Sequence, residues 1–98
     1  MYKAVILPLA QLDIAEAADW YNIKQKGLGK RFTAEVRAKV LFIRENPLAS
    51  AVRYDDTHCA VLDVFPFMIH YTVDEPNKTI IVAAVFHTSL SADRWKSR

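Results

Sequence analysis

The stretch "VFPFMIHYTVDEPNKTIIVAAVFHTSLSADRW", residues 64–95, decides the fold. It holds two runs of β-branched and aromatic residues, 67–73 and 79–86, separated by the turn-forming sequence "DEPNK". This pattern predicts two neighbouring antiparallel strands. Both runs carry apolar residues on both faces of the strand, so we expect central strands whose two faces are both covered, one of them by helices.

Two further strands are predicted upstream, at "AVRY" (51–54) and "HCAVLDVF" (58–65), which makes a meander of four strands. A fifth strand is predicted at the start of the chain, over residues 2–7, where Pro8 closes it because proline cannot donate to a strand ladder. We expect this first strand to pair with a central strand of the sheet.

Two helices are predicted between the first strand and the meander. In the first, from Leu9, apolar residues recur at helical spacing until the glycine-containing "KQKGLG" (24–29): Ala10, Ile14, Ala17, Ala18 and Tyr21. The second covers 28–46 and has one apolar stripe: Leu28, Phe32, Val36, Val40 and Ile43. It ends at Asn46, because a residue that precedes proline is pushed out of the helical region.

The predicted order is therefore β-α-α-β-β-β-β in one domain, residues 1–98. Two antiparallel helices packed on one face of a mostly antiparallel sheet form an α+β fold. The sequence "SADRWKS" (91–97) predicts one terminal helical turn, with Ser91 as its cap.

Composition limits the classes of function. The chain is 52% hydrophobic and 24% charged, which is typical of a globular domain. Cys59 is the single cysteine, so no internal disulfide is possible, and no Cys/His pattern predicts zinc binding. Apolar runs are short and interrupted, so we expect a cytoplasmic protein that does not span a membrane.

Charge is concentrated in one segment. The net charge is +2, but residues 22–44 alone carry seven basic and one acidic side chain, whereas residues 45–80 carry two basic and six acidic. A basic stripe can attract an acidic partner, and it can equally be the solvated face of a helix.

An ordered set of features resembles one protein family: the strand that ends at Pro8, Asn46-Pro47, Phe65-Pro66-Phe67, Ile69-x-Tyr71 and a last strand that ends at His87. Over essentially the whole chain it resembles the RelE/ParE superfamily of bacterial type II toxin–antitoxin toxins, in particular its plasmid-stabilisation branch. The resemblance implies a toxin that a cognate antitoxin wraps. Some members cut messenger RNA on the ribosome, and others poison DNA gyrase.

The residues decide between these activities. RNA cleavage needs clustered groups that neutralise a phosphate and transfer protons. Ribonuclease members that resemble this chain carry an arginine where it has Met68, another near Ser89, and an acid/base tyrosine near Trp95. We therefore expect no enzymatic activity and favour a ParE-like toxin that binds a large target such as gyrase. The alternatives are a ribosome-dependent endoribonuclease, and a decayed toxin that only binds its antitoxin.

Each of these functions predicts its own site residues. If the chain is a nuclease, the catalytic residues are His87 and Arg94. If it is a binder, the residues expected to contact a partner lie at the end of the chain: His87, Arg94, Trp95, Lys96 and Arg98. Arg53 is expected to join the basic residues of this tail as a rim around the sheet. Trp95 either contacts a partner or packs back on its own sheet.

The other histidines are expected to be structural. His70 and Tyr71 are adjacent in a strand, so one of them should face outward, and His58 lies beside a turn, where we expect it to be exposed. No two histidines have a ligand spacing with a carboxylate, so no metal site and no cofactor are expected. The expected partners are the antitoxin, in a joint oligomer, and gyrase or the ribosome, without direct binding to nucleic acid.

Overall fold

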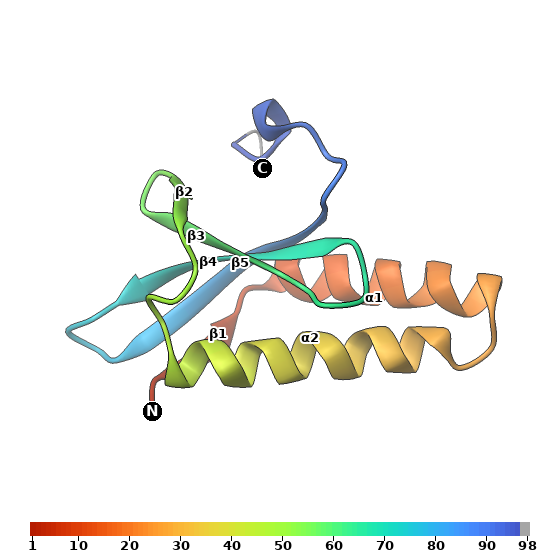
Figure 1. Cartoon of the computed structure of the whole chain (residues 1–98), viewed down its shortest axis with the longest axis horizontal. Coiled ribbons are helices and arrows are strands. Elements are labelled where there is room, and N and C mark those ends of the chain that lie inside the picture. Colours follow the sequence, from red (N-terminus) through yellow and green to blue (C-terminus); the bar gives the residue numbers. More distant parts are fainter. Residues whose placement is uncertain (97–98) are drawn as a thin grey trace.

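The computed structural model describes residues 1–96, in which two helices cover one face of a five-stranded sheet (Figure 1). The elements, in chain order, are β1 (Lys3–Ile6), α1 (Pro8–Lys24), α2 (Leu28–Glu45), β2 (Val52–Tyr54), β3 (Thr57–Val61), β4 (Phe67–Asp74), β5 (Thr79–His87) and the short 3-10 turn η1 (Ala92–Arg94). This order and the α+β architecture confirm the prediction.

The strand order in the sheet is β1-β5-β4-β3-β2. The last four strands form an antiparallel meander, and β1 joins it in parallel to β5, with Lys3 opposite Thr79 and Ile6 opposite Val82. The long crossover through both helices is what permits the parallel pair. The first strand thus pairs with an inner strand, as predicted.

The helices form a tight antiparallel hairpin. Gly27 has a left-handed backbone with φ of 86°, which glycine adopts without strain, and α2 begins at the next residue. Asn22 Oδ1 then accepts a hydrogen bond of 2.8 Å from the Gly29 amide. A side chain at Gly29 would collide with the Ala18 carbonyl, so this glycine sets how closely the two helices approach.

The main core lies between the helices and the sheet. The predicted stripe of α2 is buried there: Phe32, Val36, Val40 and Ile43. Four aromatic rings meet at its centre, with the Phe32 ring 5.0 Å from Phe67, 5.3 Å from Phe65 and 5.4 Å from Tyr21. Apolar burial of this kind is the main stabilising contribution in a small domain.

The strand predicted over 58–65 ends early, at Val61. Residues 62–66 instead form a loop that α2 holds, because the Glu35 carboxylate accepts hydrogen bonds from the Val64 and Phe65 amides at 3.1 to 3.3 Å. Those amides are therefore not available to a strand ladder, which corrects the predicted boundary.

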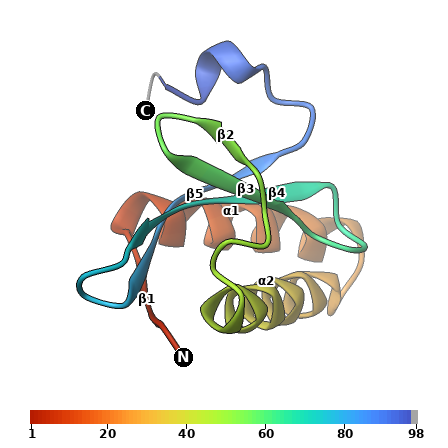
Figure 2. The ribbon, with the colours of Figure 1, turned by 60° about the vertical axis from the view of Figure 1, so that its left-hand side comes forward.

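The C-terminal segment, residues 88–96, crosses the other face of the sheet. Figure 2 shows it arching from the end of β5 over β4, β3 and β2, on the side away from the helices. The central strands are thus covered on both faces, as their apolar sequences predicted. The Ser91 side chain accepts from the Asp93 amide at the start of η1, so the predicted cap is also confirmed.

Candidate functional site

A small second core closes the sheet face opposite the helices. It consists of Cys59, Met68 and Trp95, with three partly buried residues around them: Tyr54, Phe86 and Leu90. Trp95 is only 8% exposed. It therefore packs on the sheet of its own chain, which was one of the two predictions made for Trp95, the other being contact with a partner.

His70 lies at the centre of this second core. Its Nδ1 is 2.9 Å from the Tyr54 hydroxyl and 3.5 Å from Cys59 Sγ, and its ring is 4.9 Å from the Trp95 ring. The expectation that His70 or Tyr71 faces outward is wrong, since both are fully buried. They point to opposite faces, Tyr71 into the main core and His70 under the C-terminal segment.

Cys59 is shielded in the same place. Burial raises the pKa of its thiol above the usual 9.0, and the charge of Arg53 offsets part of that rise. A thiol with a raised pKa is a weak nucleophile at neutral pH.

The prediction that His58 is exposed is also wrong. Its Nδ1 lies 2.6 Å from the Ser50 carbonyl oxygen, and its ring stacks on Tyr71 at 5.0 Å. Only 8% of its surface remains exposed. Residues 47–51, just before β2, fold back over β3 and cover His58. The sequence around the turn does not indicate this contact, because the covering residues lie earlier in the chain.

The basic residues of the tail surround Trp95. The Arg53 guanidinium lies 5.6 Å from the Trp95 ring, and Lys96 Nζ lies 3.7 Å from an Asp55 carboxylate oxygen. Arg94 is in η1 and is exposed. Arg98 lies outside the described residues. The role of these side chains in partner binding stays a prediction.

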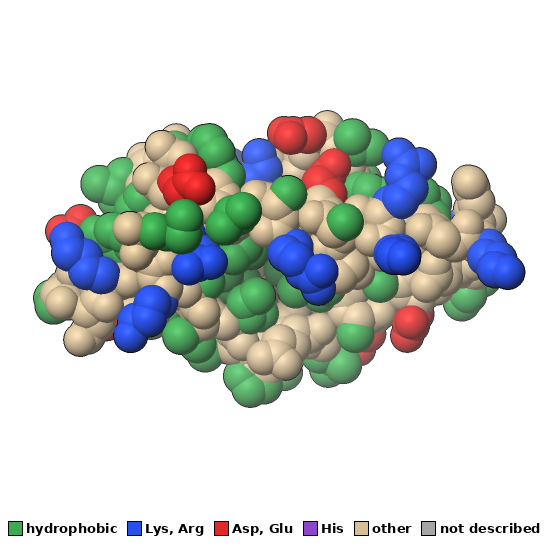
Figure 3. Space-filling model, turned by 90° about the horizontal axis from the view of Figure 1, so that it is seen from below, with side chains coloured by type: hydrophobic (Ala, Val, Ile, Leu, Met, Phe, Trp, Pro, Cys, Tyr) green, Lys and Arg blue, Asp and Glu red, His purple; other side chains and the backbone are tan. Residues whose placement is uncertain are grey.

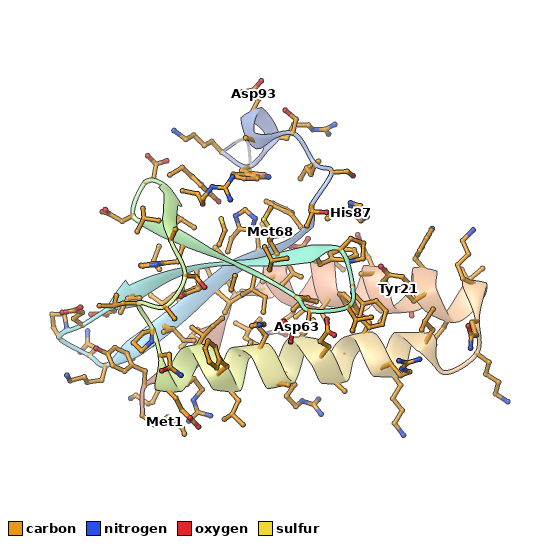
Figure 4. All side chains as sticks on the ribbon, viewed as in Figure 1. Met1, Tyr21, Asp63, Met68, His87 and Asp93 are labelled. Atoms are coloured by element: carbon orange, nitrogen blue, oxygen red, sulfur yellow. The ribbon has the colours of Figure 1, made fainter. Side chains whose placement is uncertain are left out.

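His87 is exposed at the end of β5. Its Nδ1 accepts a hydrogen bond from the Ser89 amide at 3.0 Å and lies 2.7 Å from the Ser89 hydroxyl oxygen. In the neutral ring the proton is therefore on Nε2. Phe67 packs edge-on against the ring at 5.1 Å. Figure 4 shows His87 just above the part of α1 that carries Tyr21.

A hollow of about 630 Å³ lies between α1 and the ends of β4 and β5. Its apolar wall includes Trp20, Tyr21 and Phe67, and its polar groups are Asp13, Glu16 and His87. The Asp13 carboxylate accepts a hydrogen bond of 3.0 Å from the Val85 amide, which ties α1 to β5.

The outer surface of α1 carries an apolar stripe beside this hollow. Four large side chains keep half or more of their surface exposed: Leu9 and Leu12 at 51%, Trp20 at 55% and Ile23 at 82%. Their spacing of three, eight and three residues places them on one side of the helix, with Glu16 in the middle. The sequence analysis did not predict this stripe. The pattern that indicates it is a second set of apolar residues at helical spacing, on a side of α1 other than the buried one.

The outer surface of α2 is basic by contrast. Lys30, Arg37 and Arg44 follow one another at seven-residue spacing, and Figure 3 shows Lys and Arg side chains in a band across the face formed by the helices. Arg44 also has a structural role, because its Nε donates to the Tyr2 carbonyl at 2.8 Å. The basic segment of the sequence is thus mainly a solvated helix face.

Two general features can be stated for residues 1–96. No group of three or more His, Cys, Asp or Glu side chains in this range is placed to hold a metal ion. Neither helix of this described part is both long and apolar enough to cross a membrane.

Known structures share this fold. The chain superposes on the toxin–antitoxin complex RelBE of E. coli with a TM-score of 0.69 and 17% identity, covering 89% of this chain and 96% of that one. It matches the chromosomal ParDE system of P. aeruginosa with a TM-score of 0.69 and 16% identity, over 91% and 98%. The RelBE2 complex of Mycobacterium tuberculosis matches with a TM-score of 0.63 and 16% identity, over 88% and 96%.

Sequence comparison assigns the family. A search of curated proteins gives no significant match. The family model described as ParE toxin of type II toxin-antitoxin system, parDE, matches residues 5–90, which is most of the chain and includes every element from α1 to β5. The chain therefore belongs to the ParE toxin family of type II toxin–antitoxin systems.

Proposed function

We propose that this toxin inhibits growth in the cytoplasm by binding a large cellular target, DNA gyrase being the first to test, and not by cutting RNA. The observation that carries the proposal is the cluster of Met68 and Trp95 with Cys59. Ribonuclease members that resemble this chain have an arginine where it has Met68 and an acid/base tyrosine near the position of Trp95. A thioether and an indole neither neutralise a phosphate nor transfer a proton.

The surroundings of His87 support the same proposal. A general acid or base for RNA cleavage must approach a phosphate, which is negatively charged. His87 instead shares its hollow with the carboxylates of Asp13 and Glu16. Those groups repel a phosphate, so RNA binding at this histidine would be unfavourable.

We further propose that a cognate antitoxin neutralises the toxin. Support comes from the E. coli RelBE and M. tuberculosis RelBE2 structures, which are toxin–antitoxin complexes with the same fold. The exposed apolar stripe on α1 offers a surface that such a partner would cover.

The test is induced expression of this chain alone, followed by assays for DNA breaks and for cut messenger RNA. Growth arrest with DNA breaks and intact messenger RNA is the expected result. Messenger RNA cut at codon boundaries would support the endoribonuclease alternative with His87 and Arg94. Normal growth of cells that contain the folded protein would support the decayed toxin.

A further inference from the structure

The stripe on α1 has an unusual order of side chains for an exposed helix face. Leu9 and Leu12 lie at one end and Trp20 and Ile23 at the other, all at least half exposed, and Glu16 lies between the two apolar pairs. From residue 9 to residue 23 this face is about 21 Å long, which is the length of four turns of a second helix. An apolar helix face of this length, exposed to water, is a surface for a partner.

The centre of the stripe is acidic. Asp13, Glu16 and Asp19 are the charged residues of α1 before its last residue, Lys24. Two of them, Asp13 and Glu16, line the hollow together with the rings of Trp20, Tyr21 and Phe67. Among residues 1–96, no lysine or arginine lines this hollow.

Carboxylates beside aromatic rings suit one kind of group. A guanidinium or ammonium pairs with the carboxylates and is attracted to the face of an aromatic ring. The Trp20 ring already attracts one cation, since Lys24 Nζ lies 5.0 Å from its centre, so a cation of the partner has to displace this ammonium group or approach the ring elsewhere. A partner that placed an apolar or acidic side chain here would leave Glu16 desolvated without a counter-charge, which is unfavourable.

We propose that the α1 stripe receives a helix of the neutralising partner, and that this helix is apolar at both ends with one arginine or lysine at its centre, seated between Glu16 and Trp20. This proposal rests on the proposed neutralisation by an antitoxin and adds the surface, the length and the charge of the partner segment. The basic face of α2 is excluded as the surface for this helix, since Lys30 and Arg37 would repel its central charge.

The probes are three synthetic helical peptides that differ at one central position, which is arginine, norleucine or glutamate, between two pairs of leucines with the spacing of the stripe. Their affinities for the purified full chain are measured by titration calorimetry. We expect the arginine peptide to bind tightest, and Glu16→Gln to weaken it about tenfold, the usual cost of a lost charge-assisted hydrogen bond. Glu16→Gln should not weaken the norleucine peptide, because that peptide offers no charge for Glu16 to pair with and leaves this carboxylate desolvated.

Two further variants make the test specific. Asp19→Asn removes the same charge from the same helix outside the hollow, and it should leave all three affinities unchanged. Glu16→Lys should reverse the preference, so that the glutamate peptide binds tighter than the arginine peptide. Equal binding of the arginine and norleucine peptides to the unaltered chain, or equal weakening by Glu16→Gln and Asp19→Asn, would overturn the proposal.

Failure of the proposed function is measured separately. Growth inhibition by the unaltered chain alone tests toxicity, whereas the peptide affinities test the docking surface. A chain that does not inhibit growth but prefers the arginine peptide would retain the docking surface without the toxin activity. A toxic chain without that preference would retain the toxin activity and disprove the docking surface.

Discussion

The Trp95 ring lies 4.9 Å from the His70 ring in an edge-on contact, and this pair joins the end of the chain to the centre of the sheet. It makes the C-terminal segment a cover for Cys59, whose pKa is raised by burial and partly lowered by Arg53. The pair also keeps the His70 imidazole away from the surface, because its ring is fully buried beneath Trp95.

Removal of the cover should therefore change the chemistry of Cys59. In Trp95→Ala, we expect Cys59 to react with an aromatic disulfide reagent at least about tenfold faster at pH 8, because less burial lowers the thiol pKa and opens access. Lys96→Ala is the matched control, because both side chains of the Lys96–Asp55 contact are exposed and the contact contributes little to stability. Equal rates in the two variants would mean that Trp95 does not shield the thiol.

Phe32 should be the most sensitive position of α2. It is fully buried among Tyr21, Phe65 and Phe67, so Phe32→Ala should lower the free energy of unfolding by about 3–5 kcal/mol. Phe42→Ala on the same helix is the control, because Phe42 is 49% exposed, and it should cost less than about 1 kcal/mol. Denaturant unfolding measures both, and similar losses would contradict the observed helix orientation.

Much of this fold follows from local patterns. The hairpin of β4 and β5 is evident from two apolar runs around "DEPNK", and the buried face of α2 from a stripe at helical spacing. In each case the residues that define the element are neighbours along the chain, so periodicity identifies them.

The site was harder to predict, because its residues meet only in the folded chain. The hollow joins Glu16 of α1 to His87 of β5, 71 positions later, and no local pattern indicates that pairing. His58 and His70 were misjudged for the same reason, since the segments that bury them come from residues 47–54 and from the C-terminal segment. The exposed stripe of α1 had a local signal, in Leu9, Leu12, Trp20 and Ile23, and it could have been found.

Glu35 should matter more than the ion pair beside it, although both connect α2 to the loop 62–66. Glu35→Ala leaves the Val64 and Phe65 amides without their acceptor, so we expect a loss of about 1–2 kcal/mol in unfolding free energy. Lys39→Ala removes a 3.3 Å contact to Asp63, which is 81% exposed, and a 5.5 Å contact to the Phe42 ring, and it should cost less than about 1 kcal/mol. The reverse order in thermal or denaturant unfolding would show that the amides do not need Glu35.

Stability should fall at alkaline pH. Burial, together with the Glu35 charge, raises the pKa of Tyr21 above its usual 10.0. The folded chain then holds this proton more tightly than the unfolded chain, so the stabilisation is complete below pH 10 and is lost as the pH rises further. In Tyr21→Phe the ring remains and the titration disappears, so unfolding free energy should decline less steeply between pH 9 and 11, as measured by denaturant titration at each pH. Identical slopes in the two proteins would exclude Tyr21 as a cause.

Toxicity should depend on the C-terminal segment and not on a proton at His87. His87→Gln keeps a similar size and a hydrogen-bonding side chain but removes the titratable group, so growth inhibition by induced expression should survive it. Removal of residues 91–98 deletes Trp95 together with Arg94 and Lys96, which are predicted to contact the target, so it should abolish growth inhibition.

The two variants have to be compared at equal amounts of folded protein. The main core of the truncated chain contains no residue after Val85, so circular dichroism should still show its helices and a cooperative unfolding transition. If His87→Gln instead lost toxicity while folded, and the unaltered toxin cut messenger RNA, the binding mechanism would be wrong. His87 would then be a catalytic group that works despite the carboxylates of Asp13 and Glu16, and neutralising Glu16 should increase the cleavage rate.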